Sequence, residues 1–192
     1  MLSLAITSDH PRHRSFLKSL CEKVDISCAF IEYKPNISKE FAAKERSFFS
    51  DIDDWRLPCE TIYCKKGRIN NPEIIDTIKK KKPDFIFVFG SSLLSKEIFS
   101  CPKGGCINIH TGLVQHHRGV DSCYWALYEG RPETIGATVH YIDSSIDGGD
   151  ILLQEKTNLE KTDDEDIVFL KTCQIGIELL CKNVEKIVKN EV

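Results

Sequence analysis

A chain of 192 residues has the length of one domain, and a domain of that order buries roughly 70% of its unfolded surface, so it holds a core without disulfides or metals. Its 41% hydrophobic and 29% charged residues are those of a soluble globular protein, and a net charge of -3 argues against a general nucleic-acid or membrane binder. The sequence shows neither a run of ~18 apolar residues that would span a membrane nor a signal peptide. We therefore expect a cytoplasmic protein that binds no nucleic acid and no membrane.

The nine cysteines are scattered and form no Cys-x-x-Cys pair. Many stand in apolar runs, where a thiol behaves as a small hydrophobic group. Cys59 and Cys64, like Cys101 and Cys106, have four residues between them, which is a poor match to a structural zinc site. We expect free thiols and no bound metal.

The first half of the chain alternates short apolar runs with longer mixed segments. Strands are expected at residues 2–6, 26–31 and 61–64, helices at residues 12–21 and 41–49, and a loop at residues 51–58. Asn71 before Pro72 predicts a further helix with the Asn side chain as its cap, and this helix ends in the lysines at 79–82. We attribute these lysines to the helix dipole, which they complement, rather than to a phosphate or RNA contact.

The strongest strand candidate covers residues 83–89, because residues 85–89 are all apolar, as is typical of a central parallel strand. Gly90 then starts a loop at the carboxyl edge of the expected sheet, where open α/β sheets bind their ligands. The remaining elements are strands at residues 106–109, 137–142 and 151–154, a helical turn at 123–128, and a long helix from Asp163.

An apolar stripe runs along the last helix at spacings of three and four, made of Leu170, Cys173, Ile177, Leu180, Val184 and Ile187. It covers fewer than three heptads, so we favour packing onto the chain's own sheet and keep a homodimer seam as the alternative. The alternation of strands and helices predicts an α/β fold with a doubly wound, mostly parallel, Rossmann-like sheet and a long C-terminal helix. We expect a single domain over residues 1–192.

The polar groups best suited to chemistry stand near the ends of two late strands. Asn108 and His110 are two residues apart, so their side chains point to the same side and form a pair of hydrogen-bond donors suited to an oxyanion. On spacing alone, a polar strand end facing solvent explains the pair equally well. Asp147 precedes two glycines that allow a tight turn, and its carboxylate can fix the tautomer of a histidine or accept a proton.

Two neighbouring residues have simpler interpretations. Asp150 is a rival carboxylate, but it stands just before a strand and is expected to close the turn. His140 alternates with the apolar Val139 and with Tyr141, which favours a structural histidine.

Four linked motifs resemble the folate-dependent formyltransferase family. They are Gly-Cys-Ile-Asn-Ile-His at 105–110, Arg-Gly at 118–119, Gly-Ala-Thr-Val-His at 136–140 and Ile-Asp-Gly-Gly-Asp-Ile at 146–151. The family includes glycinamide ribonucleotide, methionyl-tRNA and sugar N-formyltransferases. The resemblance is strong from residue 83 to about residue 154, and the order of several motifs makes it more specific than any one of them.

The resemblance implies a function and a set of site residues. The family moves a formyl group from N10-formyltetrahydrofolate to an amine, and its Asn, His and Asp correspond to Asn108, His110 and Asp147. Asn108 and a protonated His110 would stabilise the oxyanion, and Asp147 would take the proton of the amine. The resemblance places the donor's pterin against a loop and a strand end, at Ser91, Ser92, Leu93, Leu94, Ile142 and Asp143.

The acceptor is expected to be a nucleotide-linked amino sugar of surface-glycan biosynthesis. The first strand lacks the glycine-rich phosphate loop of glycinamide ribonucleotide enzymes, and we expect neither the added C-terminal domain nor the basic surface of the methionyl-tRNA enzymes. The expected acceptor contacts are Arg12, His13, Gln115, His117 and Arg118. The alternatives are those two formyltransferases, a formyltetrahydrofolate hydrolase, and a folate-binding module without transfer activity.

Overall fold

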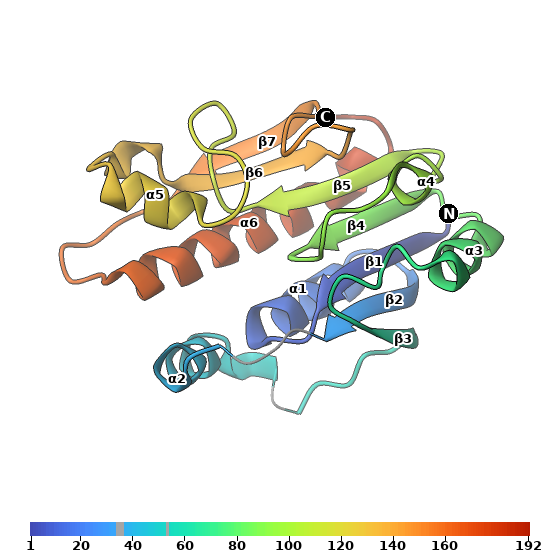
Figure 1. Ribbon diagram of the computed structural model, residues 1–192, viewed down its shortest axis with the longest axis horizontal. Helices are drawn as coiled ribbons and strands as arrows, with labels where there is room; N and C mark the ends of the chain where they lie inside the picture. The colour runs from blue at the N-terminus through green and yellow to red at the C-terminus, as the bar shows by residue number, and fades with distance from the viewer. Residues whose placement is uncertain (34–36, 53) are drawn as a thin grey trace.

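The protein is built around one mixed β-sheet (Figure 1). The computed structural model describes residues 1–33, 37–52 and 54–192. Among these residues, seven strands pair in the order β3-β2-β1-β4-β5-β6-β7. Strands β1 to β5 pair in parallel, while β6 runs antiparallel to β5 and β7 antiparallel to β6. The bounds are β1 (Ser3–Ser8), β2 (Ile26–Tyr33), β3 (Glu60–Lys65), β4 (Phe85–Phe89), β5 (Gly105–His110), β6 (Gly136–Tyr141) and β7 (Ile151–Lys156).

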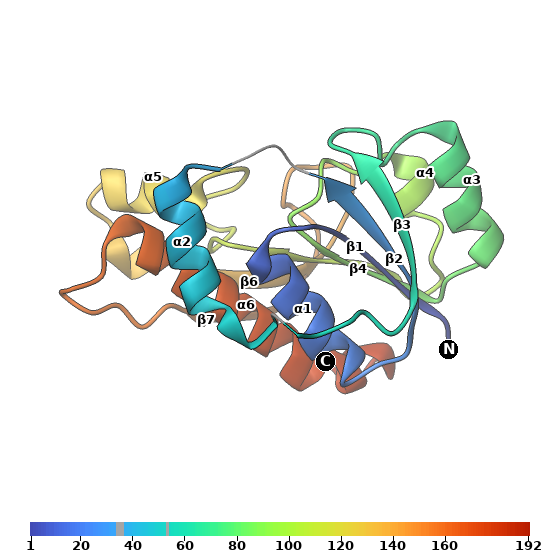
Figure 2. The same ribbon diagram turned by 90° about the horizontal axis from the view of Figure 1, so that it is seen from below.

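Helices cover both faces of this sheet (Figure 2). They are α1 (Pro11–Cys21), α2 (Lys39–Phe48), α3 (Pro72–Lys81), α4 (Lys96–Phe99), α5 (Ser122–Tyr128) and α6 (Glu165–Val188), with 3-10 turns at Ser50–Ile52 and Pro132–Thr134. Helices α1 and α6 contribute to the core on one face, and α3 and α4 to the core on the other. This arrangement confirms the predicted doubly wound, mostly parallel α/β fold with a long C-terminal helix.

The central strand β4 shows why the chain adopts two layers of helices. Phe85, Phe87 and Phe89 pack into the core beneath α1 and α6, while Ile86 and Val88 pack into the core beneath α3 and α4. Successive side chains of a strand point to opposite faces, so a strand that is apolar at every position needs cover on both sides.

The stripe on α6 packs onto the protein's own sheet, as favoured. All six of its predicted residues are buried, and the helix contacts β5, β6 and β7. Gly176 allows the close approach, because a Cβ atom at this position would lie 2.5 Å from Ile109 Cγ2.

Several local details differ from the expectations. The short helix α4 was not anticipated, because four residues are too few to show helical periodicity. Asn71 occupies the N-cap of α3 but makes no side-chain capping hydrogen bond, so the predicted cap is wrong, and Pro72 marks the helix start instead.

The nine cysteines are all free, and five of them are buried. No helix within residues 1–33, 37–52 and 54–192 is both long and apolar enough to cross a membrane.

Candidate functional site

Strands β5 and β6 place an asparagine and a histidine side by side. Asn108 pairs directly with His140 in the antiparallel ladder, so the two side chains project from the same face. Asn108 Nδ2 lies 3.2 Å from His140 Nε2, and His140 Nδ1 lies 2.8 Å from the carbonyl oxygen of Tyr141. A carbonyl only accepts, so Nδ1 carries a proton and Nε2 of the neutral ring accepts from the amide of Asn108.

A tight turn brings Asp147 against these residues. Asp147 has a left-handed backbone with φ of 46°, and a Cβ atom at Gly149 would lie 2.0 Å from the carbonyl oxygen of Tyr141. Only glycine permits that approach, which explains the second of the two glycines that follow the aspartate. The exposed Asp150 closes the turn through its carbonyl oxygen, which accepts the N–H of Tyr141.

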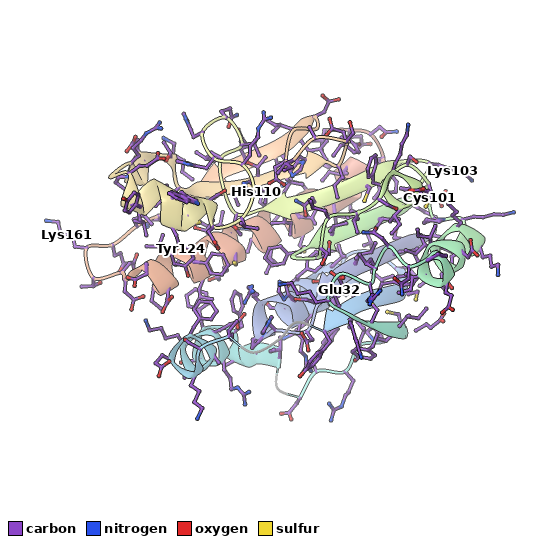
Figure 3. All side chains as sticks on the ribbon, viewed as in Figure 1. Glu32, Cys101, Lys103, His110, Tyr124 and Lys161 are labelled. Atoms are coloured by element: carbon purple, nitrogen blue, oxygen red, sulfur yellow. The ribbon has the colours of Figure 1, made fainter. Side chains whose placement is uncertain are left out.

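The carboxylate of Asp147 links two histidines. Its Oδ2 lies 3.3 Å from His110 Nδ1 and accepts the backbone N–H of Gly119 at 2.8 Å, while its Oδ1 lies 3.5 Å from His140 Nε2. Three predicted residues and His140 therefore form one cluster at the carboxyl end of β5, where Figure 3 shows His110 at the tip of the strand.

The ring of His110 is nearly enclosed, with 6% of its surface exposed. Its Nε2 lies 3.1 Å from the carbonyl oxygen of His117 and 3.3 Å from Ser122 Oγ. Burial lowers the pKa of His110 below its ordinary value, although the charge of Asp147 and the carbonyl of His117 oppose this shift. The resting ring is therefore mainly neutral near pH 7, and its protonation during the reaction stays a prediction.

The electrostatics of Asp147 favour its ionised form. Burial by itself raises the pKa of this carboxyl, but the contacts with His140 and His110, when these rings carry a charge, and the N–H of Gly119 bring the pKa below its usual value. The cluster thus combines a carboxylate with a mainly neutral imidazole, a pair suited to moving a proton.

Two members of the cluster were not assigned from the sequence. His140 was interpreted as structural, because its position opposite Asn108 depends on a strand register that no local pattern reveals. Ser122 is the first residue of α5 and was not singled out. Only the occurrence of His140 in one of the four motifs gave a signal for it.

The predicted donor loop leaves the sheet beside this cluster. Phe89 pairs with Ile109, so residues 90–95 emerge at the edge where Asn108 and His110 lie. Ser91, Ser92 and Leu94 are half-buried, and Leu93 is 75% exposed.

The second part of the predicted donor site follows β6. Ile142 donates its backbone N–H to the carbonyl oxygen of Cys106 at 2.7 Å and packs against the core next to α3 and α4. The exposed Asp143 accepts the side-chain hydroxyl of Ser145 at 2.6 Å and its backbone N–H at 2.8 Å. These hydrogen bonds lower the pKa of the Asp143 carboxyl.

Two predicted acceptor contacts lie on α1 and are occupied by other partners. The Arg12 guanidinium pairs with the fully buried Glu45 and lies over the rings of Phe41 and Phe169. His13 is buried, with Nδ1 at 2.7 Å from Ser8 Oγ. Both side chains therefore have partners within the protein, and their contact with an acceptor stays a prediction.

The other three predicted contacts come from the segment after β5. His117 is buried and bonds to Thr134 through its ring, so only its backbone carbonyl reaches His110. The exposed Gln115 bonds to Gln154. Arg118 is exposed and passes beside the Asp147 turn, with Nη1 at 3.0 Å from where a Cβ of Gly148 would lie.

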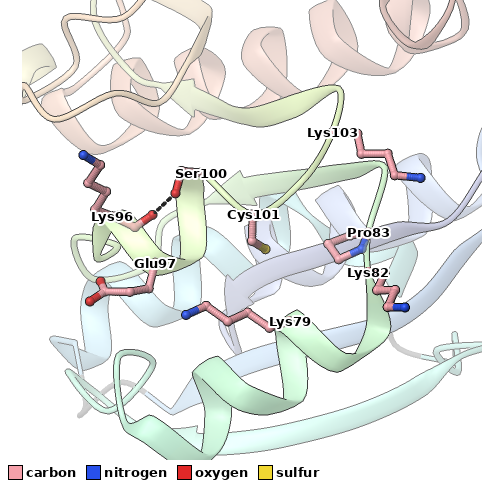
Figure 4. Close-up of a pocket in the computed structure, with 8 residues that line it drawn as sticks. All are labelled: Lys79, Lys82, Pro83, Lys96, Glu97, Ser100, Cys101 and Lys103. Atoms are coloured by element: carbon pink, nitrogen blue, oxygen red, sulfur yellow. Dashed lines mark hydrogen bonds between the residues drawn. The ribbon is translucent and has the colours of Figure 1, made fainter.

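A separate hollow of about 680 Å³ lies between α3 and α4 (Figure 4). Four lysines line it, namely Lys79, Lys82, Lys96 and Lys103. Pro83 and Lys103 precede β4 and β5, so this hollow is at the amino edge of the sheet, opposite Asn108 and His110. Its lysines diverge in Figure 4 rather than converge on one point, which agrees with the dipole interpretation of those on α3.

In the described part of the chain, no three His, Cys, Asp or Glu side chains gather in a way that could hold a metal ion.

Comparison with solved structures identifies the fold as that of formyltransferases. Phosphoribosylglycinamide formyltransferase from Anaplasma phagocytophilum superposes with a TM-score of 0.74 at 17% identity, over 99% of this chain and 88% of that one. A sugar N-formyltransferase from a Shewanella species has a TM-score of 0.69 at 21% identity, over 99% of this chain and 71% of that one.

A family model described as formyl transferase matches residues 23–184, and the chain belongs to this family. The bifunctional polymyxin resistance protein ArnA of Wigglesworthia glossinidia brevipalpis is 34% identical over 78% of this chain. A methionyl-tRNA formyltransferase of Thermodesulfovibrio yellowstonii is 33% identical over 72% of it. The chain spans 23% and 45% of the length of these two relatives. The resemblance described from the sequence is thus confirmed.

Proposed function

We propose that residues 1–192 form a catalytic domain that moves a formyl group from N10-formyltetrahydrofolate to the primary amine of a small acceptor. The observation that carries the proposal is the cluster of Asn108, His110 and Asp147 in a member of the formyl transferase family. An amide donor, an imidazole and a carboxylate are the groups that acyl transfer requires.

The residues divide the work of the transfer between them. The amine nitrogen bonds to the formyl carbon, and the amide N–H of Asn108 donates to the oxygen that becomes negative. His140 holds this amide through the 3.2 Å contact, so that its nitrogen faces the reaction. The donor, when bound, would supply the formyl group, and its N10 would take up the proton that the amine releases.

The proton of the amine passes to Asp147, either directly or through His110. When His110 becomes charged, its two N–H groups face the Asp147 carboxylate at 3.3 Å and the His117 carbonyl at 3.1 Å. The surroundings thus disfavour the charged ring by burial but provide a hydrogen-bond acceptor for each of its protons. Such a ring accepts a proton transiently and releases it again.

The donor fits the loop and strand end beside this cluster. The loop at 91–94 offers the exposed Leu93 side chain, which suits contact with a flat heterocycle. The bound donor supplies an activated formyl group, and Ser91, Ser92, Leu93, Leu94, Ile142 and Asp143 would hold it.

We further propose a nucleotide-linked amino sugar as the acceptor. The turn after β1 leads directly from His10 to Pro11, the first residue of α1, without a glycine-rich phosphate loop. Arg118 is exposed beside the Asp147 turn and offers a cation for a phosphate group. We therefore retain Arg118 as an acceptor contact and assign Arg12 and His13 structural roles.

The test is a transfer assay with several acceptors. The protein would be incubated with N10-formyltetrahydrofolate and nucleotide-linked amino sugars, glycinamide ribonucleotide or methionyl-tRNA, and products analysed by mass spectrometry. We expect an amino sugar to gain one formyl group. Transfer to glycinamide ribonucleotide alone would exclude the sugar, and formate release without an acceptor would indicate a hydrolase.

A further inference from the structure

We infer that Glu32 and Asn70 are positioning residues, which hold the loop after β4 in the shape that receives the formyl donor. The inference rests on the proposed function. Neither residue belongs to the predicted site, and both come from the other half of the sheet, from β2 and from the connection between β3 and α3.

The loop itself has no regular secondary structure between Gly90 and α4, so its backbone groups need partners from elsewhere. Side chains supply them. Three backbone groups of the loop, at Ser92, Leu93 and Ser95, bond to just two side chains.

Glu32 is fully buried near the carboxyl end of β2, and it is labelled in Figure 3. Its Oε2 accepts the N–H of Ser92 at 2.6 Å, and its Oε1 accepts the N–H of Gly67 at 2.9 Å. The hydroxyl of Ser92 also accepts from the N–H of Gly67 at 3.2 Å. A buried carboxylate is costly unless it accepts hydrogen bonds, so Glu32 ties the two loops together as one unit.

Asn70 forms hydrogen bonds to the loop through both polar atoms of its side-chain amide. Its Nδ2 donates to the carbonyl oxygen of Leu93 at 2.8 Å, and its Oδ1 accepts the N–H of Ser95 at 2.7 Å. This pairing requires one donor and one acceptor on the same side chain. An aspartate would set a carboxylate against the Leu93 carbonyl, and an alanine would lose both hydrogen bonds.

The functional consequence is preorganisation of the donor site. A loop held before binding loses less conformational entropy when the ligand arrives, which raises affinity without any new contact to the ligand. Leu93, which is 75% exposed, is then presented on a fixed loop at the carboxyl edge of the sheet. Changes at Glu32 and Asn70 should therefore affect the donor far more than the acceptor.

The test compares Asn70→Ala with Asn71→Ala. Asn71 is the matched control, because it is the adjacent asparagine and makes no side-chain capping hydrogen bond. We expect Asn70→Ala to raise the KM for N10-formyltetrahydrofolate about tenfold, which corresponds to about 1.4 kcal/mol. The acceptor KM and kcat should change by less than about twofold, which corresponds to about 0.4 kcal/mol, and Asn71→Ala should behave as the wild type.

Two further variants keep the inference falsifiable if Asn70→Ala does not fold. Asn70→Asp and Glu32→Gln retain size and should also weaken donor binding, measured directly by calorimetry with tetrahydrofolate. Equal donor KM values in the Asn70 and Asn71 variants, or a parallel change of both KM values, would overturn the inference. A wild-type protein that neither binds nor uses the donor would instead overturn the proposed function.

Discussion

Asn108 and His140 face each other across β5 and β6, with Asn108 Nδ2 at 3.2 Å from His140 Nε2. This contact orients the amide that the proposed transfer uses, and it links Asn108 to Asp147 through a single imidazole. The histidine is therefore part of the candidate site, although it was interpreted as structural from the sequence.

Replacing His140 tests that assignment. We expect His140→Ala to lower kcat by roughly 10²-fold, because a displacement of the Asn108 amide by about 1 Å reduces the rate by that factor. His116→Ala is the matched control, since His116 is exposed and lies outside the cluster. Steady-state kinetics with both variants will show the difference, and equal turnover in the two would assign His140 a structural role alone.

Replacing Asn108 or Asp147, the two residues proposed to act directly in the transfer, should lower kcat more than replacing His140. We expect Asn108→Ala to lower kcat by roughly 10²- to 10³-fold, the cost of one oxyanion donor. Asp147→Ala should lower kcat by roughly 10²- to 10⁴-fold, the contribution of a positioned general base. Asp150→Ala serves as the control carboxylate, because Asp150 is exposed and contributes its backbone carbonyl to the turn. Near-normal turnover in the Asn108 and Asp147 variants would contradict the mechanism.

The buried ring of His110 should make stability depend on pH. Its pKa is lowered by burial, so as the pH falls the unfolded chain binds a proton at this position before the folded chain does. The stability due to the neutral ring is fully present above the ordinary pKa of about 6.5 and declines below it. Urea unfolding at pH 7.5 and at pH 5.5 should show that the free energy of unfolding falls more for the wild type than for His110→Asn. Equal decreases in the two proteins would refute the assignment of this pH dependence to His110.

Gly149 should tolerate no side chain. A Cβ atom there meets the backbone carbonyl of Tyr141 at 2.0 Å, whereas one at Gly148 meets the side-chain hydroxyl of Ser145 at 2.1 Å, which can rotate away. We expect Gly149→Ala to cost about 1–3 kcal/mol through overpacking and to displace Asp147, with a loss of turnover. Gly148→Ala is the matched control and should be milder in thermal unfolding; the reverse order would contradict the turn geometry.

Arg12 offers a test of structural against substrate roles. Glu45 is fully buried and Arg12 is its ionic partner, so Arg12→Met would leave a buried charge unpaired and cost about 3–5 kcal/mol. The double variant with Glu45→Gln removes that charge and should recover much of the stability. Chemical denaturation measures both effects, and a stable Arg12→Met protein with a raised acceptor KM would restore Arg12 as a substrate contact.

Much of the fold was predictable because its signals are local. The uninterrupted apolar run in β4 and the three-and-four spacing along α6 each reflect the faces that these elements bury. The same holds for Asn108 and His110, whose shared face follows from a spacing of two on a strand. The unpredicted α4 and the absent Asn71 cap are short-range details that depend on neighbouring loops.

The sequence by itself determined the α/β class, the family motifs and three of the polar groups in the cluster, because periodicity and residue type are local properties of the chain. Only the tertiary structure decided which side chains meet: His140 opposite Asn108, Arg12 on Glu45, and Glu32 and Asn70 on the loop after β4. These contacts join residues that are 23 to 60 positions apart. They depend on strand order and register, which are set by burial of the whole sheet and not by any one segment.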